Sequence, residues 1–297
     1  MSDTTANMRL KIGEAKDLQS VVRTMKAVAA ASIGQYPKAE LALDDYYHTV
    51  ELGLGACFRA EDPVVLSLKS KSHRAPRVIG AVVFGSDQGL VGRFNEVVSD
   101  FAVKALSARP GQHHVWAVGE RVQGLLTDAG LPPQGVFGVP TSVNAVAPLV
   151  GEILVQTEQV LRPHEVSELH LFYNSSTSGA VYAPVGQRLL PLDESWRHDL
   201  AGRRWPTKTH PEVMGTGVAT LRALISGYLF VSLFRACTES LTSENASRLA
   251  AMQRADKNIG DILKKLDMTF HRLRQSAIDE ELFDVIAAFE ALGGGRG

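Results

Sequence analysis

Cysteine is scarce in this sequence, and the few cysteines form no recognisable motif. The chain of 297 residues has two of them, Cys57 and Cys237, which lie far apart and make no CxxC pair. This usage argues against a disulfide-rich fold and a CxxC metal site, and it is typical of a reducing compartment. We expect both thiols to do no more than pack.

The sequence also has little net charge and no long hydrophobic run. Its formal net charge is −1, which gives no reason to expect nucleic acid as a partner. The longest apolar run, 223–234, would reach only about 18 Å as a helix, against about 30 Å for a bilayer core. The opening letters MSDTTANMRLK show no basic region followed by an apolar core. We expect neither a transmembrane segment nor a secretory signal.

Catalytic and metal-binding motifs are missing as well. The nine histidines give no H-E-x-x-H or paired Cys/His spacing, and no G-x-S-x-G nucleophile elbow occurs. The carboxylates of DEELFD, residues 279–284, are clustered as on a solvated helix face. We therefore expect no catalytic residue, no metal site and no bound cofactor in this chain.

One glycine-rich stretch, VVFGSDQGLVGRFN at 82–95, raises the question of a phosphate loop. An apolar run enters a loop with three glycines, a helix is predicted to start near Leu90, and such loops bring backbone N–H groups close to phosphates. The spacing fits neither the Walker pattern nor G-x-G-x-x-G, no Lys-Ser or Lys-Thr follows Gly92, and Asp87 would repel a phosphate. We interpret the stretch as a strand-to-helix turn, with a nucleotide-dependent enzyme as the alternative.

Prolines are absent before Pro37 and after Pro211, and in both end regions the apolar residues follow coiled-coil spacing. The N-terminal stripe steps by three, four and three through Leu18, Val21, Met25 and Val28, beside a second stripe of Val22, Ala29, Ser32 and Tyr36. The C-terminal stripe steps by four and three through Ile259, Leu263, Leu266, Phe270, Leu273 and Ala277. A C-terminal helix of about 75 residues would be roughly 110 Å long, too long for one domain to cover. We predict that the two ends form one antiparallel coiled coil.

Between the ends, strand-like and helix-like segments alternate, which predicts a Rossmann-like α/β domain of largely parallel strands. Within it, Ser142 is a candidate N-cap of a helix. Residues 193–215 are predicted to form a polar loop. The predicted domains are an N-terminal shaft helix at 1–58, the α/β domain at 76–192 and a C-terminal shaft helix at 212–292.

This layout, together with several sequence motifs, resembles the gamma subunit of F-type ATP synthases. The stretches that carry the resemblance are LKIGEAKDLQSVVRTMKAVAAAS at 10–32, GSDQGLVGRFN at 85–95, RLLPL at 188–192, SLTSENASRLAAMQRADKNIGDIL at 240–263 and HRLRQSAIDEEL at 271–282. They cover nearly the whole chain in the family's order. Departures include Ser32 for the usual lysine, Gln88 for arginine and Asp279 for threonine, and the segment 193–217 lacks the usual acidic stretch. The chain is therefore similar to a divergent branch, such as the gamma chain of an alternative F-type complex.

The resemblance implies a rotor shaft inside a ring of alpha and beta subunits, with an α/β foot on the membrane c-ring that also holds the epsilon subunit. It implies that Met25, Arg274, Gln275 and Asp279 contact the catalytic beta subunits. The expected location is the cytoplasmic face of a bacterial inner membrane. The alternatives are the nucleotide-binding enzyme and a coiled-coil adaptor that does not rotate.

The end of the last helix carries one broad apolar stripe, formed by Ile278, Leu282, Val285, Ile286, Phe289 and Leu292. A helix that starts near Leu10 leaves nothing to cover this stripe. The resemblance implies that the collar of the alpha–beta ring covers it, so we expect Ile278, Leu282, Val285 and Phe289 to act as a rotor tip bearing. The final letters GGGRG are expected to fray.

Overall fold

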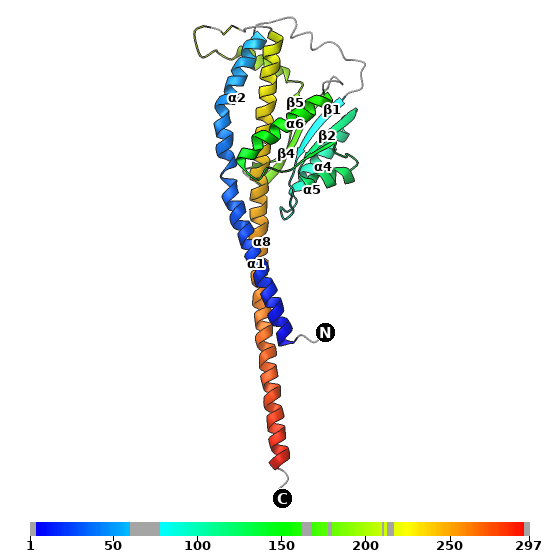
Figure 1. Cartoon of the computed structure of the whole chain (residues 1–297), viewed down its shortest axis with the longest axis vertical. Helices are drawn as coiled ribbons and strands as arrows, with labels where there is room; N and C mark the ends of the chain where they lie inside the picture. Colours follow the sequence, from blue (N-terminus) through cyan, green and yellow to red (C-terminus); the bar gives the residue numbers. More distant parts are fainter. Residues whose placement is uncertain are drawn as a thin grey trace. The chain divides into compact units, whose positions relative to one another are not determined.

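The computed structural model describes residues 4–59, 78–161, 168–177, 180–209, 211–212 and 217–293 (Figure 1). The chain divides into two compact units, which are described separately. The first comprises Met1–Val28 with Leu249–Gly297, and the second is Ala29–Arg248. The end of the chain beyond residue 293, predicted to fray, lies outside the described residues.

The second unit is built on a five-stranded sheet of order β3-β2-β1-β4-β5. Its strands are β1 (Val78–Phe84), β2 (Gln112–Val118), β3 (Gly135–Phe137), β4 (Glu168–Thr177) and β5 (Ala180–Leu190). β1 pairs in parallel with β2 and β4, and β2 pairs in parallel with β3. Only β5 is antiparallel, in a hairpin with β4. The predicted α/β class with largely parallel strands is confirmed.

Helices cover both faces of this sheet, so alternate residues of β1 enter two different cores. On one face, Ile79 and Val83 pack with α4 (Phe94–Ser107) and α5 (Glu120–Asp128). On the other face, Val82 and Phe84 belong to the core that includes residues of α2 (Tyr36–Arg59), α6 (Val146–Leu161) and α8 (Gly217–Gly293). All seven residues of β1 are buried, which explains the unbroken apolar run that the sequence shows there.

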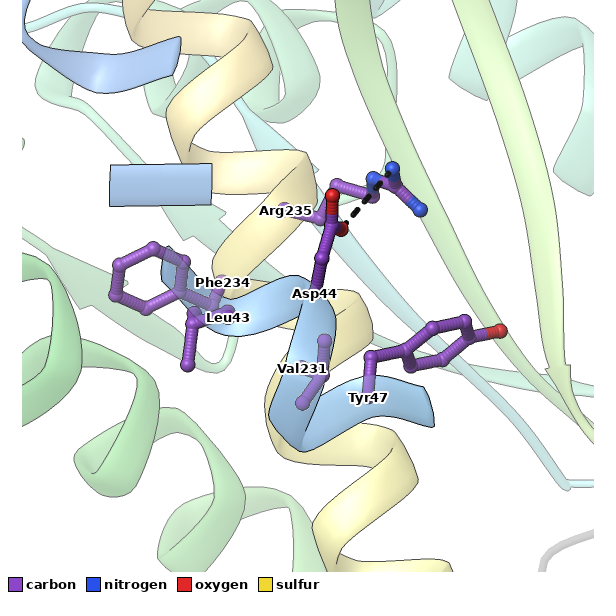
Figure 2. Close-up of a pocket in the computed structure, with 6 residues that line it drawn as sticks. All are labelled: Leu43, Asp44, Tyr47, Val231, Phe234 and Arg235. Carbon is purple, nitrogen blue, oxygen red and sulfur yellow. Dashed lines mark ion pairs between the residues drawn. The ribbon is translucent and has the colours of Figure 1, made fainter. Parts of the chain in front are cut away.

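Within this unit, α2 lies alongside the first part of α8 (Figure 1). Leu43 and Tyr47 of α2 and Val231, Phe234 and Arg235 of α8 line a cavity of about 10 Å³ (Figure 2). That volume holds at most one water molecule, so this cavity is a packing defect and not a ligand site. Asp44 also lines the cavity, and its carboxylate lies 4.0 Å from the Arg235 guanidinium in an ion pair that Figure 2 shows.

Three local predictions in this unit were wrong. The predicted polar loop 193–215 contains α7 (Glu194–Gly202), whose N-cap Asp193 accepts a hydrogen bond from the backbone N–H of Ser195 at 2.8 Å. This helix is too short for a clear periodicity, although Asp193 is a good N-cap residue. Ser142 makes no side-chain cap bond, because a short 3₁₀ turn, η1 (Val143–Ala145), precedes α6. The helix predicted near Leu90 begins at Phe94.

The first unit pairs α1 (Thr5–Ile33) with the second part of α8 in antiparallel fashion. The guanidinium of Arg9 lies 5.4 Å from the ring centroid of Phe270, while Gln19 lies within hydrogen-bonding distance of Asp256. As the residue number rises along α1 it falls along α8, which confirms the predicted antiparallel coiled coil.

The face on which α1 packs differs from the first predicted stripe. Leu18, Val21 and Val28 are each more than half exposed, whereas Val22 is buried in a cluster with Met252 and Ile259. The neighbouring stripe therefore faces α8. In the described part of this unit α1 packs on a single helix, so only one of two adjacent apolar stripes is covered, and spacing alone does not say which.

The N-terminal region is also not one helix. A turn at residues 34–35 separates α1 from α2, so the single shaft helix predicted over 1–58 is two helices. Gly34 and Pro37 together account for the break, because glycine is unfavourable in a helix interior and the ring of Pro37 would clash with the carbonyl of Ile33 in a continuous helix.

By length and composition, α8 is the one helix in the described ranges that could cross a membrane, with an 18-residue window of mean hydropathy 1.6. Its first part supplies apolar residues to the core of the second unit, among them the buried Leu221, Leu229 and Leu233. Core helices of water-soluble proteins reach the same hydropathy, so the hydropathy of this segment is weak evidence that α8 crosses a membrane.

Candidate functional surface

The glycine-rich loop after β1 is held by its own side chains. The Asp87 carboxylate accepts hydrogen bonds from the backbone N–H of Glu120, the first residue of α5, at 3.1 Å and from that of Val139 at 2.8 Å. The side chain of Asn95 bonds both the backbone N–H and the hydroxyl of Ser86. The N-terminus of α5, where a phosphate could have bound, is therefore already occupied by a carboxylate.

The glycines of this region serve close packing. A Cβ added to Gly85 would lie 2.5 Å from the Val122 side chain, and one added to Gly119 would lie 2.7 Å from the backbone oxygen of Ser86. Gly119 also has a φ of 111°, which favours glycine. The glycine-rich loop connects β1 to α4, as the sequence interpretation proposed. These contacts pack that loop closely against the start of α5, and they disfavour a nucleotide site there.

The same loop contacts α8 through a buried polar patch. The hydroxyl of Ser247 donates to the backbone oxygen of Val91 at 2.5 Å, and Arg248 donates to the buried Glu244 carboxylate at 2.6 Å. Burial raises the pKa of the Glu244 carboxyl, Arg248 opposes this, and the negative charge of Asp87 adds to it. The patch fixes the glycine-rich loop against one stretch of α8 and leaves little room for a ligand.

The thiols are buried and show no sign of chemistry. Cys57 and Cys237 are both free and buried. Burial raises the pKa of each thiol, which keeps it in the unreactive protonated form. Within the described residues, no group of three or more His, Cys, Asp or Glu side chains converges on a point where a metal could bind.

The exposed end of α8 is the most unusual surface of the first unit. Arg9 of α1 contacts Phe270 of α8, and α1 begins at Thr5. The N-terminal end of α1 therefore lies only about one helical turn beyond this contact. Every side chain described from residue 274 to 288 is exposed. Several of them are large and apolar: Ile278, Leu282, Phe283, Val285 and Ile286. About four turns of helix, with these apolar side chains among polar ones, are thus uncovered by any other described part of the unit.

The predicted contact residues lie in two different settings. Arg274, Gln275 and Asp279 are exposed on α8, at or next to the start of the uncovered segment. Met25 is half-buried on α1 and packs against the cluster around Val22, so it is at least partly a core residue. Phe289 lies in α8, but its side chain is outside the described residues.

Two features were missed from the sequence. Phe283 is 69% exposed and extends the apolar surface beside the predicted stripe. It was missed because it directly follows Leu282 and so does not fit the three-and-four spacing of the stripe. The Asp256 carboxylate accepts hydrogen bonds from three side chains of α1, those of Gln19, Arg23 and Lys26, at 3.1, 3.2 and 2.9 Å. Its signal would have been an acid three residues before Ile259, the first position of the C-terminal stripe, together with the basic Arg23 and Lys26 of the N-terminal segment.

Chains with this fold occur in solved structures of mitochondrial ATP synthases. A chain of the Euglena gracilis mitochondrial ATP synthase, described as OSCP/F1/c-ring in rotational state 3, matches with a TM-score of 0.65 at 16% identity. The match covers 98% of this chain and 95% of that one. A chain of the Tetrahymena thermophila mitochondrial ATP synthase central stalk/c-ring matches with a TM-score of 0.54 at 22% identity, covering 79% and 99%. At these identities the likeness shows the fold, which is that of chains found in ATP synthase complexes.

The sequence comparisons identify the family. The sequence model described as ATP synthase matches residues 4–292. The ATP synthase gamma chain of Hydrogenobaculum sp. (strain Y04AAS1) is 25% identical over 96% of this chain and 97% of its own length. That of Sorangium cellulosum (strain So ce56) is 27% identical over 96% and 98%. The chain belongs to the gamma-chain family of ATP synthases.

Proposed function

We propose that this chain is the rotating central shaft of an F-type ATP synthase. In this role it couples ion flow through a membrane c-ring to the synthesis or hydrolysis of ATP on beta subunits. The chain itself is non-catalytic, and the nucleotides bind to partner subunits. The observation that carries the proposal is the uncovered apolar end of α8, residues 274–288, in a chain of this family.

The partners follow from the same role. A ring of alpha and beta subunits surrounds the paired helices, and the α/β domain contacts the epsilon subunit and the c-ring. The complex lies at the cytoplasmic face of a bacterial inner membrane, a location supported by the bacterial relatives. The functional segments are 1–58, 76–192 and 212–292, with α7 in the connection between the last two.

An apolar tip suits a rotor because hydrophobic contact is weakly directional. Hydrogen bonds and ion pairs have preferred geometries, and would hold the shaft at particular angles. We assign Ile278, Leu282, Val285 and Phe289 to the bearing, the contact surface between the tip and the alpha–beta collar. Phe283 extends it.

Directional contacts are assigned to the polar side chains at the start of the uncovered segment and beside the bearing, where force would pass between subunits. Arg274, Gln275 and Asp279 are exposed and polar, and we assign them to beta-subunit contacts, in which a guanidinium can pair with carboxylates. Met25 joins them through its exposed part, because an unbranched thioether adapts to changing neighbours. Differential contacts of this kind at different rotor angles would change the nucleotide affinity of each beta subunit, as coupling requires.

The test is assembly and coupling of the complex with altered tips. The tagged chain should co-purify with alpha and beta subunits. Ile278→Asp should weaken ATP-driven ion pumping by the reconstituted complex, while the matched variant Ala287→Asp, on the opposite side of the same helix, should affect it less. Equal losses in the two variants would contradict an apolar bearing at Ile278, and absence of alpha and beta from the purified material would refute the rotor role.

The nucleotide-enzyme alternative makes a different prediction. It requires ATP to bind the isolated chain at the glycine-rich loop, with weaker binding after Gly89→Asp. We expect no ATP binding at this loop and no ATP hydrolysis, because the Asp87 carboxylate occupies the α5 N-terminus. Calorimetry that finds stoichiometric micromolar ATP binding sensitive to Gly89→Asp would favour the enzyme.

A further inference from the structure

A basic cavity lies in the second unit, where the segment after α7 meets the end of α2. Its volume is about 330 Å³, at the lower end of the range for small-ligand sites. The residues that line it are Arg59, Ala201, Gly202, Arg203, Arg204, Trp205, Thr207 and Lys208. Four of them are cationic, and none is acidic.

The framework of this cavity is built from specific contacts. Arg59, the last residue of α2, donates hydrogen bonds to the backbone oxygens of Ala201 at 2.9 Å and Arg203 at 2.6 Å. Arg203 forms a 2.6 Å ion pair with Glu51, whose side chain is only 11% exposed. Gly55 allows α7 to approach, since a Cβ there would lie 2.6 Å from the backbone oxygen of Leu200. These contacts fix the backbone that presents the remaining cations.

Two cations at the mouth of the cavity have no ion-pair partner among the described residues. Arg203 is matched by Glu51, but Arg204 and Lys208 form no ion pair with any other described residue, and both are exposed. Trp205 between them is half-buried and contributes an aromatic wall, and Thr207, whose hydroxyl donates to the backbone oxygen of Thr209 at 2.9 Å, also lines the cavity. The cavity therefore combines concentrated positive charge, an aromatic surface and a hydroxyl in one short stretch of chain.

We infer that this cavity binds the phosphate group of a phosphate-bearing ligand. An arginine guanidinium presents paired N–H donors that match phosphate oxygens, and a lysine adds a point charge. The volume exceeds that of a lone phosphate, and tryptophan is enriched where apolar and polar surroundings meet. An anionic phospholipid headgroup and a free phosphate share this chemistry. The inference does not depend on the rotor role, because it rests on the cavity alone.

The test uses the full-length chain and the double variant Arg204→Gln/Lys208→Gln. In one arm, binding is measured to vesicles of phosphatidylcholine with and without phosphatidylglycerol. In the other, inorganic phosphate is titrated calorimetrically. Wild-type chain should bind at least one probe, and the double variant should bind it about thirtyfold more weakly, since each cation near an anionic surface contributes about fivefold. Vesicle binding that requires phosphatidylglycerol identifies an anionic lipid headgroup, whereas saturable binding of inorganic phosphate identifies a soluble ligand.

The matched control is Lys257→Gln/Lys265→Gln, which removes the same charge from exposed positions on α8. It should retain wild-type binding, and thermal melting should be alike in all three proteins because none of the four side chains is buried. The charge-retaining variant Arg204→Lys/Lys208→Arg should restore vesicle binding. Failure of the wild type to bind either probe, or equal loss in the control, would overturn the inference.

Discussion

The two ends of α8 contain the same amino acid in opposite surroundings. Leu233, in the second unit, is 1% exposed, and Leu282, in the first, is 56% exposed. Leu233 is surrounded by the core to which α2, α6 and the sheet contribute, whereas Leu282 lies beyond the reach of α1. The comparison shows that a leucine in an apolar helix stripe indicates burial only when another element covers it. An uncovered stripe of the same kind indicates a contact surface.

The largest expected effect is that of Leu233→Ala. Truncating a fully buried leucine removes its transfer free energy and leaves a cavity, at a cost of about 2–5 kcal/mol. Urea unfolding of the isolated chain, followed for the second unit, should show a lower midpoint with an unchanged slope. A loss below about 0.5 kcal/mol would mean that this part of α8 is not covered as the core cluster indicates.

A smaller effect is expected for Phe270→Ala in the coiled coil. If Phe270 were fully buried, its truncation would cost several kcal/mol. The structure shows it half-buried beneath the Arg9 guanidinium, so we expect a loss of about 1–2 kcal/mol from partial burial and the cation–π contact. Thermal unfolding monitored by circular dichroism measures the loss. Met268→Ala, at a position 65% exposed, is the matched control and should change little.

The sequence was sufficient to predict the architecture, because the two kinds of periodicity in it are strong. The seven buried residues of β1 and the four-three steps from Ile259 to Phe270 each left a clear pattern. The sequence did not determine which stripe of α1 is buried. Val21 and Val22 are equally apolar neighbours, and only the position of α8 decides that Val22 is covered.

Only the part of the candidate surface that follows helical spacing could be predicted from the sequence. Spacing placed Ile278 and Leu282 on one stripe, and their exposure was inferred from the absence of a partner segment. The Asp256 cluster joins residues far apart in sequence, and the basic cavity needs Arg59 of α2 to pack against the stretch 201–208. No local pattern encodes such encounters.

The hydrogen bonds between Asp256 of α8 and α1 should make the stability of the chain depend on pH. Hydrogen bonds from Lys26, Arg23 and Gln19 hold the pKa of the Asp256 carboxyl below its ordinary value. A carboxyl with a lowered folded-state pKa adds stability above its unfolded pKa, near 4, and this is lost as pH falls through the folded value. Melting of the chain between pH 7 and pH 2 should therefore show an acid-dependent loss that Asp256→Asn reduces. Asp261→Asn, at an exposed position with a 3.9 Å ion pair, should leave the pH profile unchanged.

The smallest effect on folding is expected for Leu282→Ala, which completes the comparison with Leu233. Because Leu282 is exposed, its truncation should change the free energy of unfolding of the isolated chain by no more than about 0.5 kcal/mol. In the assembled complex the same change removes part of the proposed bearing, so ATP-driven ion pumping should fall while ATP hydrolysis continues. Measured together, urea unfolding and pumping separate the two roles of leucine in α8. A large drop in the stability of the isolated chain would show that Leu282 is a core residue, and the bearing assignment would then be wrong.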